Sequence, residues 1–327
     1  MNLRISLILI TILAWVSIFG VLIYKSDIGE EKVIQDSSFF YRISSQDISN
    51  ISITNNSKSF SWYLGDDRVW YFDGMNKIPT DSFRWGGIID LLAGPKLYRT
   101  ISENIDDKSK YGLENPSTEI SIYLNNGDKR TLYIGNETPD NLNNYAYLEG
   151  VEKLVMLDAT WKGVLGRLVD EPPYPKWMYK LVPEEALEIV IIKDNEIYKA
   201  YAINDEGWHE CDLPISSTPC NGNNQAEKEY IENFLVDFSN INILGAVQLN
   251  LLFEEDYKQY GLGLEAPYVD IKTISRDASG TNTIYNTSIS IGKLNEDKTG
   301  YFSVAKETKD VILTEKEWTE KILQVFD

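Results

Sequence analysis

The chain is poor in the side chains from which most catalytic and metal sites are built. Among its 327 residues it has one histidine, His209, and two cysteines, Cys211 and Cys220. A Ser-His-Asp or Cys-His arrangement would have to use this histidine, which lies in an expected strand and is more typical of a strand-surface residue. The three side chains are suitable zinc ligands, but their spacing matches no common zinc site. We therefore expect no catalytic residue, no metal and no cofactor.

Basic residues and phosphate-binding motifs are also scarce. The chain has 31 Lys and Arg against 50 Asp and Glu, which gives a formal net charge of −19 and a pI near 4.5. Proteins that bind nucleic acid need clustered basic side chains to displace counterions from phosphates. No Gly-x-Gly-x-x-Gly and no P-loop occurs. We expect neither nucleic acid nor a nucleotide as a partner. A hydrophobic content of 43% still indicates a folded protein.

Acidic side chains are plentiful, and two interpretations of them stay open. Carboxylates are numerous enough for two to meet, so a carboxylate-dependent envelope hydrolase of the paired-acid type remains an alternative. No local pattern singles out such a pair. Residues 295–300, Asn-Glu-Asp-Lys-Thr-Gly, have the composition of a calcium loop. A terminal bidentate acid at the required spacing is missing, so a hairpin turn is expected there.

The N-terminal segment is long and apolar. Residues 5–24 contain no charged side chain, and a helix of that length is about 30 Å long, the thickness of a bilayer's hydrocarbon core. A cleaved signal peptide is the alternative, because Arg4 precedes the apolar run. The run is longer than usual for a signal peptide, and no small-x-small cleavage site follows it. We expect residues 1–25 to form an uncleaved anchor that binds the lipid bilayer through residues 5–24.

The short N-terminal flank favours one orientation of this anchor. A span with only four residues before it usually leaves its N-terminus in the cytoplasm. We expect a single-pass protein of a bacterial inner membrane with the bulk of the chain periplasmic, that is, extracytoplasmic. In that compartment Cys211 and Cys220, nine positions apart in a loop-like stretch, form either a disulfide or two unpaired thiols. The disulfide is the favoured alternative.

One set of sequence elements occurs twice in the same order. Residues 111–116, Tyr-Gly-Leu-Glu-Asn-Pro, return as residues 260–267, Tyr-Gly-Leu-Gly-Leu-Glu-Ala-Pro. Each copy is followed by an Ile-Gly pair and by a Val-x-Leu segment before a tryptophan: Ile134-Gly135, 155–157 and Trp161 in the first, Ile291-Gly292, 311–313 and Trp318 in the second. Matching elements in fixed order imply one folding unit used twice. The Tyr-Gly-Leu segments are expected to be structural, with the glycine supplying a backbone angle that other residues resist.

Hydrophobic periodicity predicts mostly strands, with a packing helix and a closing helix in each unit. The first unit is expected to have strands at 48–53, 60–64, 69–72, 97–101, 118–124, 131–134, 145–148 and 154–157, with helices at 80–92 and 161–168. The second is expected to have strands at 187–192, 197–203, 207–209, 243–249, 268–274, 283–291, 301–304 and 311–313, with helices at 231–238 and 314–325. Strands without βαβ alternation indicate an α+β protein with mostly antiparallel sheets.

Five segments follow from these patterns. They are the transmembrane anchor 1–25, a juxtamembrane connector 26–45, a first α+β repeat 46–170, a Pro-rich linker 171–182 and a second α+β repeat 183–327. Three prolines fall within residues 172–175. Because proline cannot continue a helix, the linker is expected to be extended and stiff.

The order of these elements resembles the domain-of-unknown-function family 4340, with the second unit a divergent copy. The resemblance is carried by the anchor, the Trp-containing strands and helix, residues 111–116, the hairpin ending at 134–136 and the strand 155–157 before a helix. It covers about residues 45–327. The resemblance implies a membrane-anchored extracytoplasmic protein of the kind often associated with ABC-type transport systems related to gliding-motility transporters. It implies no catalytic residue.

These observations favour a non-enzymatic accessory or scaffold subunit of an envelope membrane complex. An ABC-type transport assembly is the first expectation, with a multi-span permease as partner and another subunit carrying the ATPase. An accessory subunit of another large membrane complex, such as an energy-transducing one, is the alternative in the same class. The hydrolase is the alternative in a different class.

Overall fold

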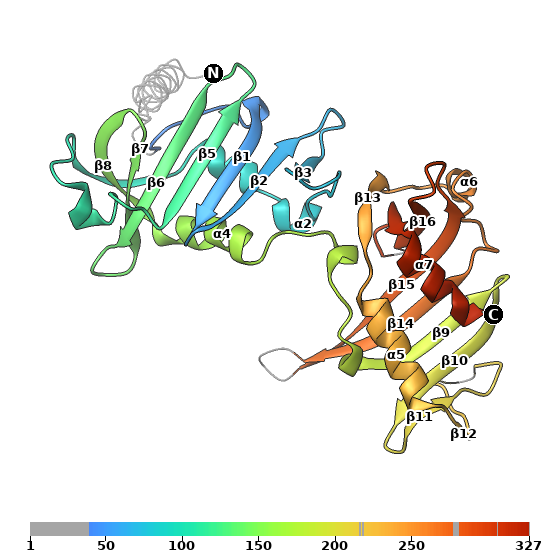
Figure 1. The fold of residues 1–327 in the computed structure, drawn as a ribbon. Coiled ribbons are helices and arrows are strands. Elements are labelled where there is room, and N and C mark those ends of the chain that lie inside the picture. The colour runs from blue at the N-terminus through green and yellow to red at the C-terminus, as the bar shows by residue number, and fades with distance from the viewer. Residues whose placement is uncertain (1–38, 216, 218, 277–280, 306, 327) are drawn as a thin grey trace, which may run out of the picture.

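The computed structural model describes residues 39–215, 217, 219–276, 281–305 and 307–326 (Figure 1). The predicted anchor over residues 1–25 lies outside this set, as does the connector up to residue 38. In the part of the chain that is described, no helix is both long and apolar enough to cross a membrane.

The first unit is an eight-stranded antiparallel sheet. Its strands lie in the order β3-β2-β1-β5-β6-β7-β8-β4. They are β1 (Ile48–Asn55), β2 (Lys58–Leu64), β3 (Trp70–Phe72), β4 (Leu97–Ser102), β5 (Thr118–Leu124), β6 (Lys129–Glu137), β7 (Asn143–Leu148) and β8 (Val151–Asp158). Alternation places Ile51, Ile53, Ile120 and Ile122 on one face, where all four are fully buried. This inner face carries the core of the unit.

Helices cover the inner face of the first sheet. They are α2 (Ser82–Trp85), α3 (Ile88–Ala93) and α4 (Ala159–Asp170). The single packing helix predicted over residues 80–92 is wrong, because the chain breaks at Gly86 and Gly87. Gly87 has φ 78°, a left-handed conformation that a continuous helix cannot include. Trp85 and Leu92 still reach the core from the two short helices.

The second unit is a nine-stranded antiparallel sheet in the order β12-β11-β10-β9-β14-β15-β16-β17-β13. Its strands are β9 (Ala186–Lys193), β10 (Glu196–Asn204), β11 (Gly207–Glu210), β12 (Asn224–Gln225), β13 (Ile243–Gln248), β14 (Tyr268–Arg276), β15 (Asn282–Leu294), β16 (Gly300–Ala305) and β17 (Asp310–Glu315). Its helices are α5 (Lys228–Ser239), α6 (Glu254–Lys258) and α7 (Lys316–Leu323). Figure 1 shows α5 and α7 on one side of this sheet. The predicted class, α+β with mostly antiparallel sheet, is confirmed.

The two sheets have the same topology. Read from β3 and from β11, the strand orders coincide position by position, and β12 is an added edge strand. The registers coincide as well: Ile51 pairs with Trp62 across β1 and β2, and Ile189 pairs with Tyr201 across β9 and β10. One folding unit is therefore present twice, although the second unit carries longer loops.

The linker is attached to both units. Arg84 donates from Nη1 to the carbonyl oxygen of Pro172 at 2.8 Å, and the ring of Tyr174 stacks on Phe72 with centroids 4.7 Å apart. Two residues past the last of the three prolines, Trp177 is buried and donates from Nε1 to Asp310 Oδ2 at 2.8 Å. These contacts bind the linker to the first sheet at one end and to the second at the other.

Candidate functional site

The Tyr-Gly-Leu segment of the first unit closes a turn against the sheet. A 3-10 helix, η2 (Lys108–Tyr111), ends at Gly112, which has φ 67°. Leu113 follows and is 1% exposed. Gly135 of β6 lies so close to the Tyr111 carbonyl oxygen that a β-carbon at position 135 would collide with it. The glycines are required by backbone geometry and by close packing.

The second unit repeats this arrangement. Gly261 has φ 73°, Leu262 is buried, and a β-carbon at Gly292 would collide with the Tyr260 carbonyl oxygen. The ring of Tyr260 packs on Phe302 with centroids 5.0 Å apart. In the first unit Tyr111 packs on Tyr145 at 4.9 Å. The segments are structural latches, as predicted, and both units have them.

The main difference lies on the outer face of each sheet, the face away from the helices. In the second unit a loop over residues 211–222 lies on this face. Cys211 and Cys220 are joined by a disulfide, and both are buried against Ala200 and Ala202. The sequence predicted a loop-like stretch and favoured a disulfide for the two cysteines; the structure adds that their side chains form a small core with Ala200 and Ala202.

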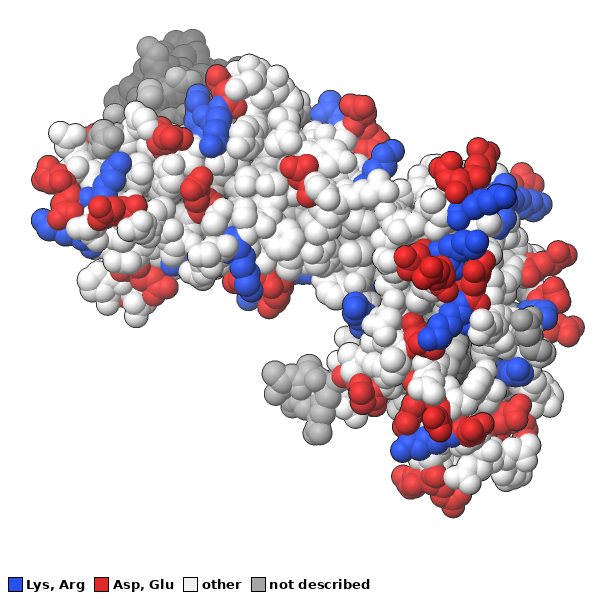
Figure 2. All heavy atoms as spheres, viewed as in Figure 1, with Lys and Arg blue, Asp and Glu red and all other residues white. Residues whose placement is uncertain are grey.

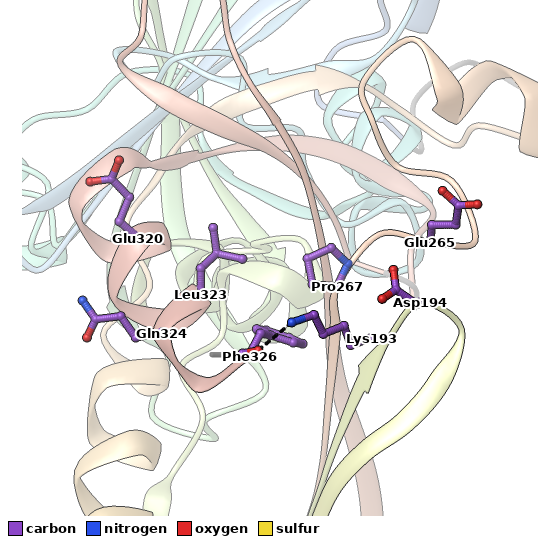
Figure 3. A pocket seen from close by; sticks show the side chains of 8 residues that line it. All are labelled: Lys193, Asp194, Glu265, Pro267, Glu320, Leu323, Gln324 and Phe326. Atoms are coloured by element: carbon purple, nitrogen blue, oxygen red, sulfur yellow. Dashed lines mark hydrogen bonds between the residues drawn. The ribbon is translucent and has the colours of Figure 1, made fainter.

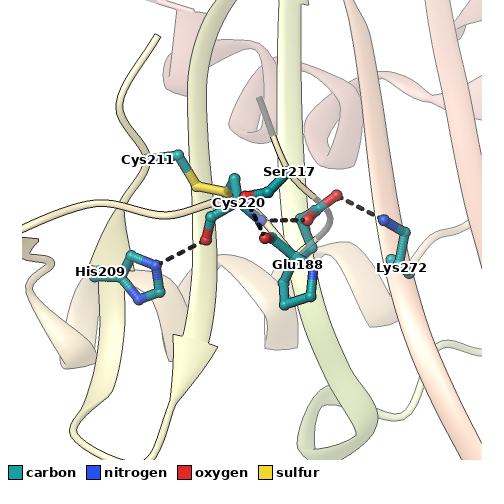
Figure 4. The surroundings of a disulfide bond; sticks show 7 residues. Glu188, His209, Cys211, Ser217, Cys220 and Lys272 are labelled. Atoms are coloured by element: carbon teal, nitrogen blue, oxygen red, sulfur yellow. Dashed lines mark hydrogen bonds and ion pairs between the residues drawn. A yellow bond between two sulfur atoms is a disulfide. The ribbon is translucent and has the colours of Figure 1, made fainter. Parts of the chain in front are cut away.

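Side chains of the sheet hold the backbone of this loop at Cys220 (Figure 4). The Cys220 amide donates to Glu188 Oε2 at 3.1 Å, and its carbonyl oxygen lies 3.1 Å from His209 Nε2. Glu188 Oε1 is paired with Lys272 Nζ at 2.7 Å, with both side chains largely buried. Ala202 lies between His209 and Glu188 in the register of β9, β10 and β11. Its small side chain leaves room for the peptide.

His209 was expected on the strand surface, but it is 8% exposed because the disulfide loop covers it. Sequence analysis did not identify Glu188 and Lys272 as a pair. The available signal was Glu188 itself, a charged residue inside the apolar run 186–192. Charged side chains in such a run are rarely buried unless they are paired.

The disulfide between Cys211 and Cys220 can be tested by alkylation of the two cysteines. Without reduction, denatured protein should take up no alkylating reagent, and after reduction it should take up two equivalents by intact mass. Reduction should lower the free energy of unfolding by about 2–3 kcal/mol, because the open loop gains conformational freedom in the unfolded chain. Two alkyl groups added without any reductant would show that the cysteines are free thiols.

In the first unit the outer face carries a line of hydroxyl side chains, of which Ser121 and Thr131 are buried and Ser61 and Ser52 are half-buried. Adjacent cross-strand partners place Ser61, Ser52, Ser121 and Thr131 in one line across β2, β1, β5 and β6. We call these four the hydroxyl row. Ser61 donates to Ser52 Oγ at 3.0 Å. Among the described residues, Figure 1 shows no helix in front of this face, which we call the open face.

Longer side chains flank the hydroxyl row on both sides. On one side are Tyr71, Tyr63, Asn50 and Tyr123, here called the tyrosine row. In this row the rings of Tyr63 and Tyr71 stack with centroids 5.6 Å apart. On the other side the rings of Tyr133 and Tyr147 stack at 4.8 Å. Burial, followed by the nearby carboxylates of Glu119 and Glu149, raises the pKa of Tyr133, so its phenol stays protonated and able to donate at neutral pH.

The tyrosine row occupies the same positions in the repeat as the side chains that hold Cys220 in the second unit, which we call the clamp. Because Ile51 corresponds to Ile189, the row Tyr71, Tyr63, Asn50 and Tyr123 corresponds to His209, Ala202, Glu188 and Lys272. Where the second unit has a small side chain beneath its own loop, the first unit has Tyr63. The disulfide loop thus covers this surface in the second unit, whereas in the first unit Asn50 and Tyr123 are exposed, Tyr63 is half-buried and Tyr71 is buried and donates to Asp67 Oδ2 at 2.6 Å.

Charge is distributed unevenly between the units. Residues 46–170 include 18 acidic and 13 basic residues, whereas residues 183–327 include 27 acidic and 12 basic, so the second unit holds −15 of the net −19. Figure 2 shows the first unit with only scattered charged side chains and the second with many. The open face lies on the less charged unit.

Carboxylates also line a pocket of about 370 Å³ in the second unit (Figure 3). Glu320 lies across the pocket from Asp194 and Glu265, with apolar side chains between them. Lys193 donates to the Phe326 carbonyl oxygen at 2.8 Å. Figure 3 shows Asp194 and Glu265 on the same side of the pocket.

Two other sites considered from the sequence are a metal site and the calcium-like loop at residues 295–300. Within the described ranges, no group of three or more His, Cys, Asp or Glu is arranged to hold a metal ion. Residues 295–300 join β15 to β16, and Asn295 Oδ1 accepts from the Thr299 amide at 2.9 Å. The hairpin turn predicted there is confirmed.

Comparison with known proteins gives one match. Residues 70–163 match the family described as Domain of unknown function (DUF4340), which confirms the family resemblance over that part of the first unit. No curated protein and no solved structure matches. The match runs from β3 to the start of α4 and includes the latch at 111–116.

Proposed function

We propose that the protein is a single-pass, membrane-anchored extracytoplasmic scaffold subunit of an envelope membrane complex, in the first place an ABC-type transport assembly. In this proposal residues 5–24 span the bilayer, the N-terminus is cytoplasmic, and both repeats lie outside the cytoplasm. The open face of the first sheet binds a protein subunit of the complex. The second repeat is a closed copy that acts as a rigid support.

One observation carries the proposal: the same sheet face holds a peptide segment in the second unit, whereas none of the described segments lies across the hydroxyl row in the first. The clamp on Cys220 binds a backbone N–H and a backbone C=O with side chains of one row. Such contacts are what a sheet face uses to hold a loop of another protein. The first unit offers this face without a covering segment of its own among the described residues.

The composition of the open face suits a protein partner. Tyrosine supplies rigid contact area at a small cost in conformational entropy, and serine supplies adaptable hydrogen bonds. Protein interfaces are enriched in aromatic residues and depleted of Lys, Glu and Asp at their centres. The side chains of the hydroxyl row and the tyrosine row are uncharged, although the carboxylates of Asp67 and Glu119 lie beside them. A neutral, polar loop of a neighbouring subunit fits this surface best.

A Ser61→Arg variant tests the proposal. It places a long cation at the β2 end of the hydroxyl row, where it would obstruct a docked loop, and should reduce the partner recovered from mild-detergent membranes at least about tenfold, the effect of losing about 1.4 kcal/mol of binding. Recovery is measured by quantitative mass spectrometry of the affinity-purified full chain.

The matched control is Gln225→Arg, which adds the same charge to the exposed edge strand β12. It should leave recovery unchanged. A permease and an ATPase in the wild-type sample would support the transport assembly, and subunits of an energy-transducing complex would favour that alternative. A wild-type chain recovered alone, or equal recovery with Ser61→Arg, would contradict the scaffold function.

A further inference from the structure

A surface pocket of about 530 Å³ lies where the described chain begins. Phe39, Phe40, Tyr98, Arg99, Val151 and Lys153 are among the side chains that line it. Phe39 bridges to Lys96 at the start of β4, so the first described residue is part of the pocket wall. The pocket therefore lies at the β4 edge of the first sheet, beside the first described residue.

The pocket combines cations with exposed apolar and aromatic groups. Tyr98 is 67% exposed and Val151 is 40% exposed. Arg99 and Lys153 supply two positive charges. Lys153 also forms an ion pair with the exposed Glu103, in which Nζ and Oε1 are 3.3 Å apart. Arginine binds phosphate oxygens with a planar, two-pronged donor set. Aromatic rings with a polar end favour the headgroup region of a bilayer.

The chain length fixes how far this pocket can be from the membrane. Fourteen residues, 25–38, separate the end of the proposed span from Phe39. Fourteen residues span at most about 50 Å even when fully extended. A weak site tethered so closely meets its ligand at a high effective concentration. The pocket is thus the part of the described protein that is best placed to contact lipid headgroups.

The charge distribution also favours an orientation in which the pocket faces the bilayer. The unit that carries the pocket has a formal charge of −5 over residues 46–170, from 18 acidic and 13 basic residues, while residues 183–327 carry −15. An anionic bilayer surface repels the second unit more strongly than the first. The basic edge with Arg99 and Lys153 therefore faces the bilayer at the lowest electrostatic cost.

We infer that this pocket binds the phosphate headgroup of an anionic phospholipid in the outer leaflet. Arg99 and Lys153 contact the phosphate, and Tyr98, Val151 and the two phenylalanines lie against the upper acyl region. The inference rests on the proposed membrane attachment. It adds a specific lipid site that would set the height and tilt of the first sheet, and hence the position of its open face.

The test uses the full chain in nanodiscs of phosphatidylcholine with or without phosphatidylglycerol. Amide hydrogen exchange across β4, residues 97–102, should slow about threefold with phosphatidylglycerol present, as expected when a site is about two-thirds occupied. An Arg99→Gln/Lys153→Gln variant should lose this difference. The control Lys228→Gln/Lys316→Gln, which removes two cations from exposed helix positions of the second unit, should keep it.

Each outcome has a separate meaning. Exchange in β4 that does not depend on lipid composition in nanodisc-embedded protein would overturn the lipid site while leaving the anchor intact. Protein that elutes apart from the nanodiscs would instead overturn the membrane attachment. Equal slowing by inorganic phosphate in pure phosphatidylcholine would contradict a lipid as the ligand. Equal slowing in the Arg99→Gln/Lys153→Gln variant would also overturn the assignment, because it would reflect the charged surface alone.

Discussion

Gly135→Ala should destabilise the protein by about 3 kcal/mol or more, and Gly292→Ala should do the same in the second unit. In each case the added β-carbon would collide with a backbone carbonyl oxygen, that of Tyr111 or Tyr260. A backbone atom cannot move aside as a flexible side chain can, so the latch would have to open. The midpoint of urea unfolding of the full chain in detergent measures the loss.

Gly163→Ala is the matched control. Gly163 lies inside α4, and a β-carbon there would meet no atom within 4 Å. Alanine in a helix interior is favoured over glycine by about 0.5–1 kcal/mol, so this variant should be slightly more stable than the wild type. If Gly135→Ala and Gly292→Ala unfold at the wild-type midpoint, the latches do not hold the turns to the sheets.

Lys272→Met should cost about 3–5 kcal/mol, because it leaves the buried Glu188 carboxylate without its cation. The paired atoms are 2.7 Å apart, and the side chains are 17% and 7% exposed. Glu188 also accepts the Cys220 amide, so the disulfide loop should loosen with the loss of the pair. Thermal unfolding and limited proteolysis of the loop report the two effects.

The double variant Glu188→Gln/Lys272→Met shows whether the instability of Lys272→Met comes from the unpaired charge of Glu188. A neutral glutamine can still accept the Cys220 amide and leaves no buried charge, so the double variant should be more stable than Lys272→Met alone. A double variant that is less stable than the single one would contradict a buried, compensated pair at this position.

The sequence predicts the strands of this fold well because their periodicity is local. The alternation of Ile51 and Ile53 identifies β1, and the repeated Tyr-Gly-Leu segment identifies two copies of one unit. The break in the first packing helix was missed because Trp85, Ile88 and Leu92 have helical spacing. The left-handed glycine at position 87 interrupts the backbone without disturbing that spacing.

The outer faces could not be predicted in the same way. The hydroxyl row joins Ser52, Ser61, Ser121 and Thr131 from four strands, and only the registers between strands bring them together. In the same way, Lys272 reaches Glu188 from 84 residues away in the sequence. Polar residues on strands resemble any solvated face until the pairing is known. A covering loop is visible only in three dimensions.

Site-specific photo-cross-linking in native membranes tests the central claim most directly. A photoreactive residue would replace Tyr123, on the open face and 38% exposed, or Tyr230, on α5 and 43% exposed. The account predicts that position 123 of the full chain forms an adduct with an integral-membrane subunit and that position 230 does not. The absence of any adduct at 123, or the same adducts at both positions, would contradict a docking function for the first sheet.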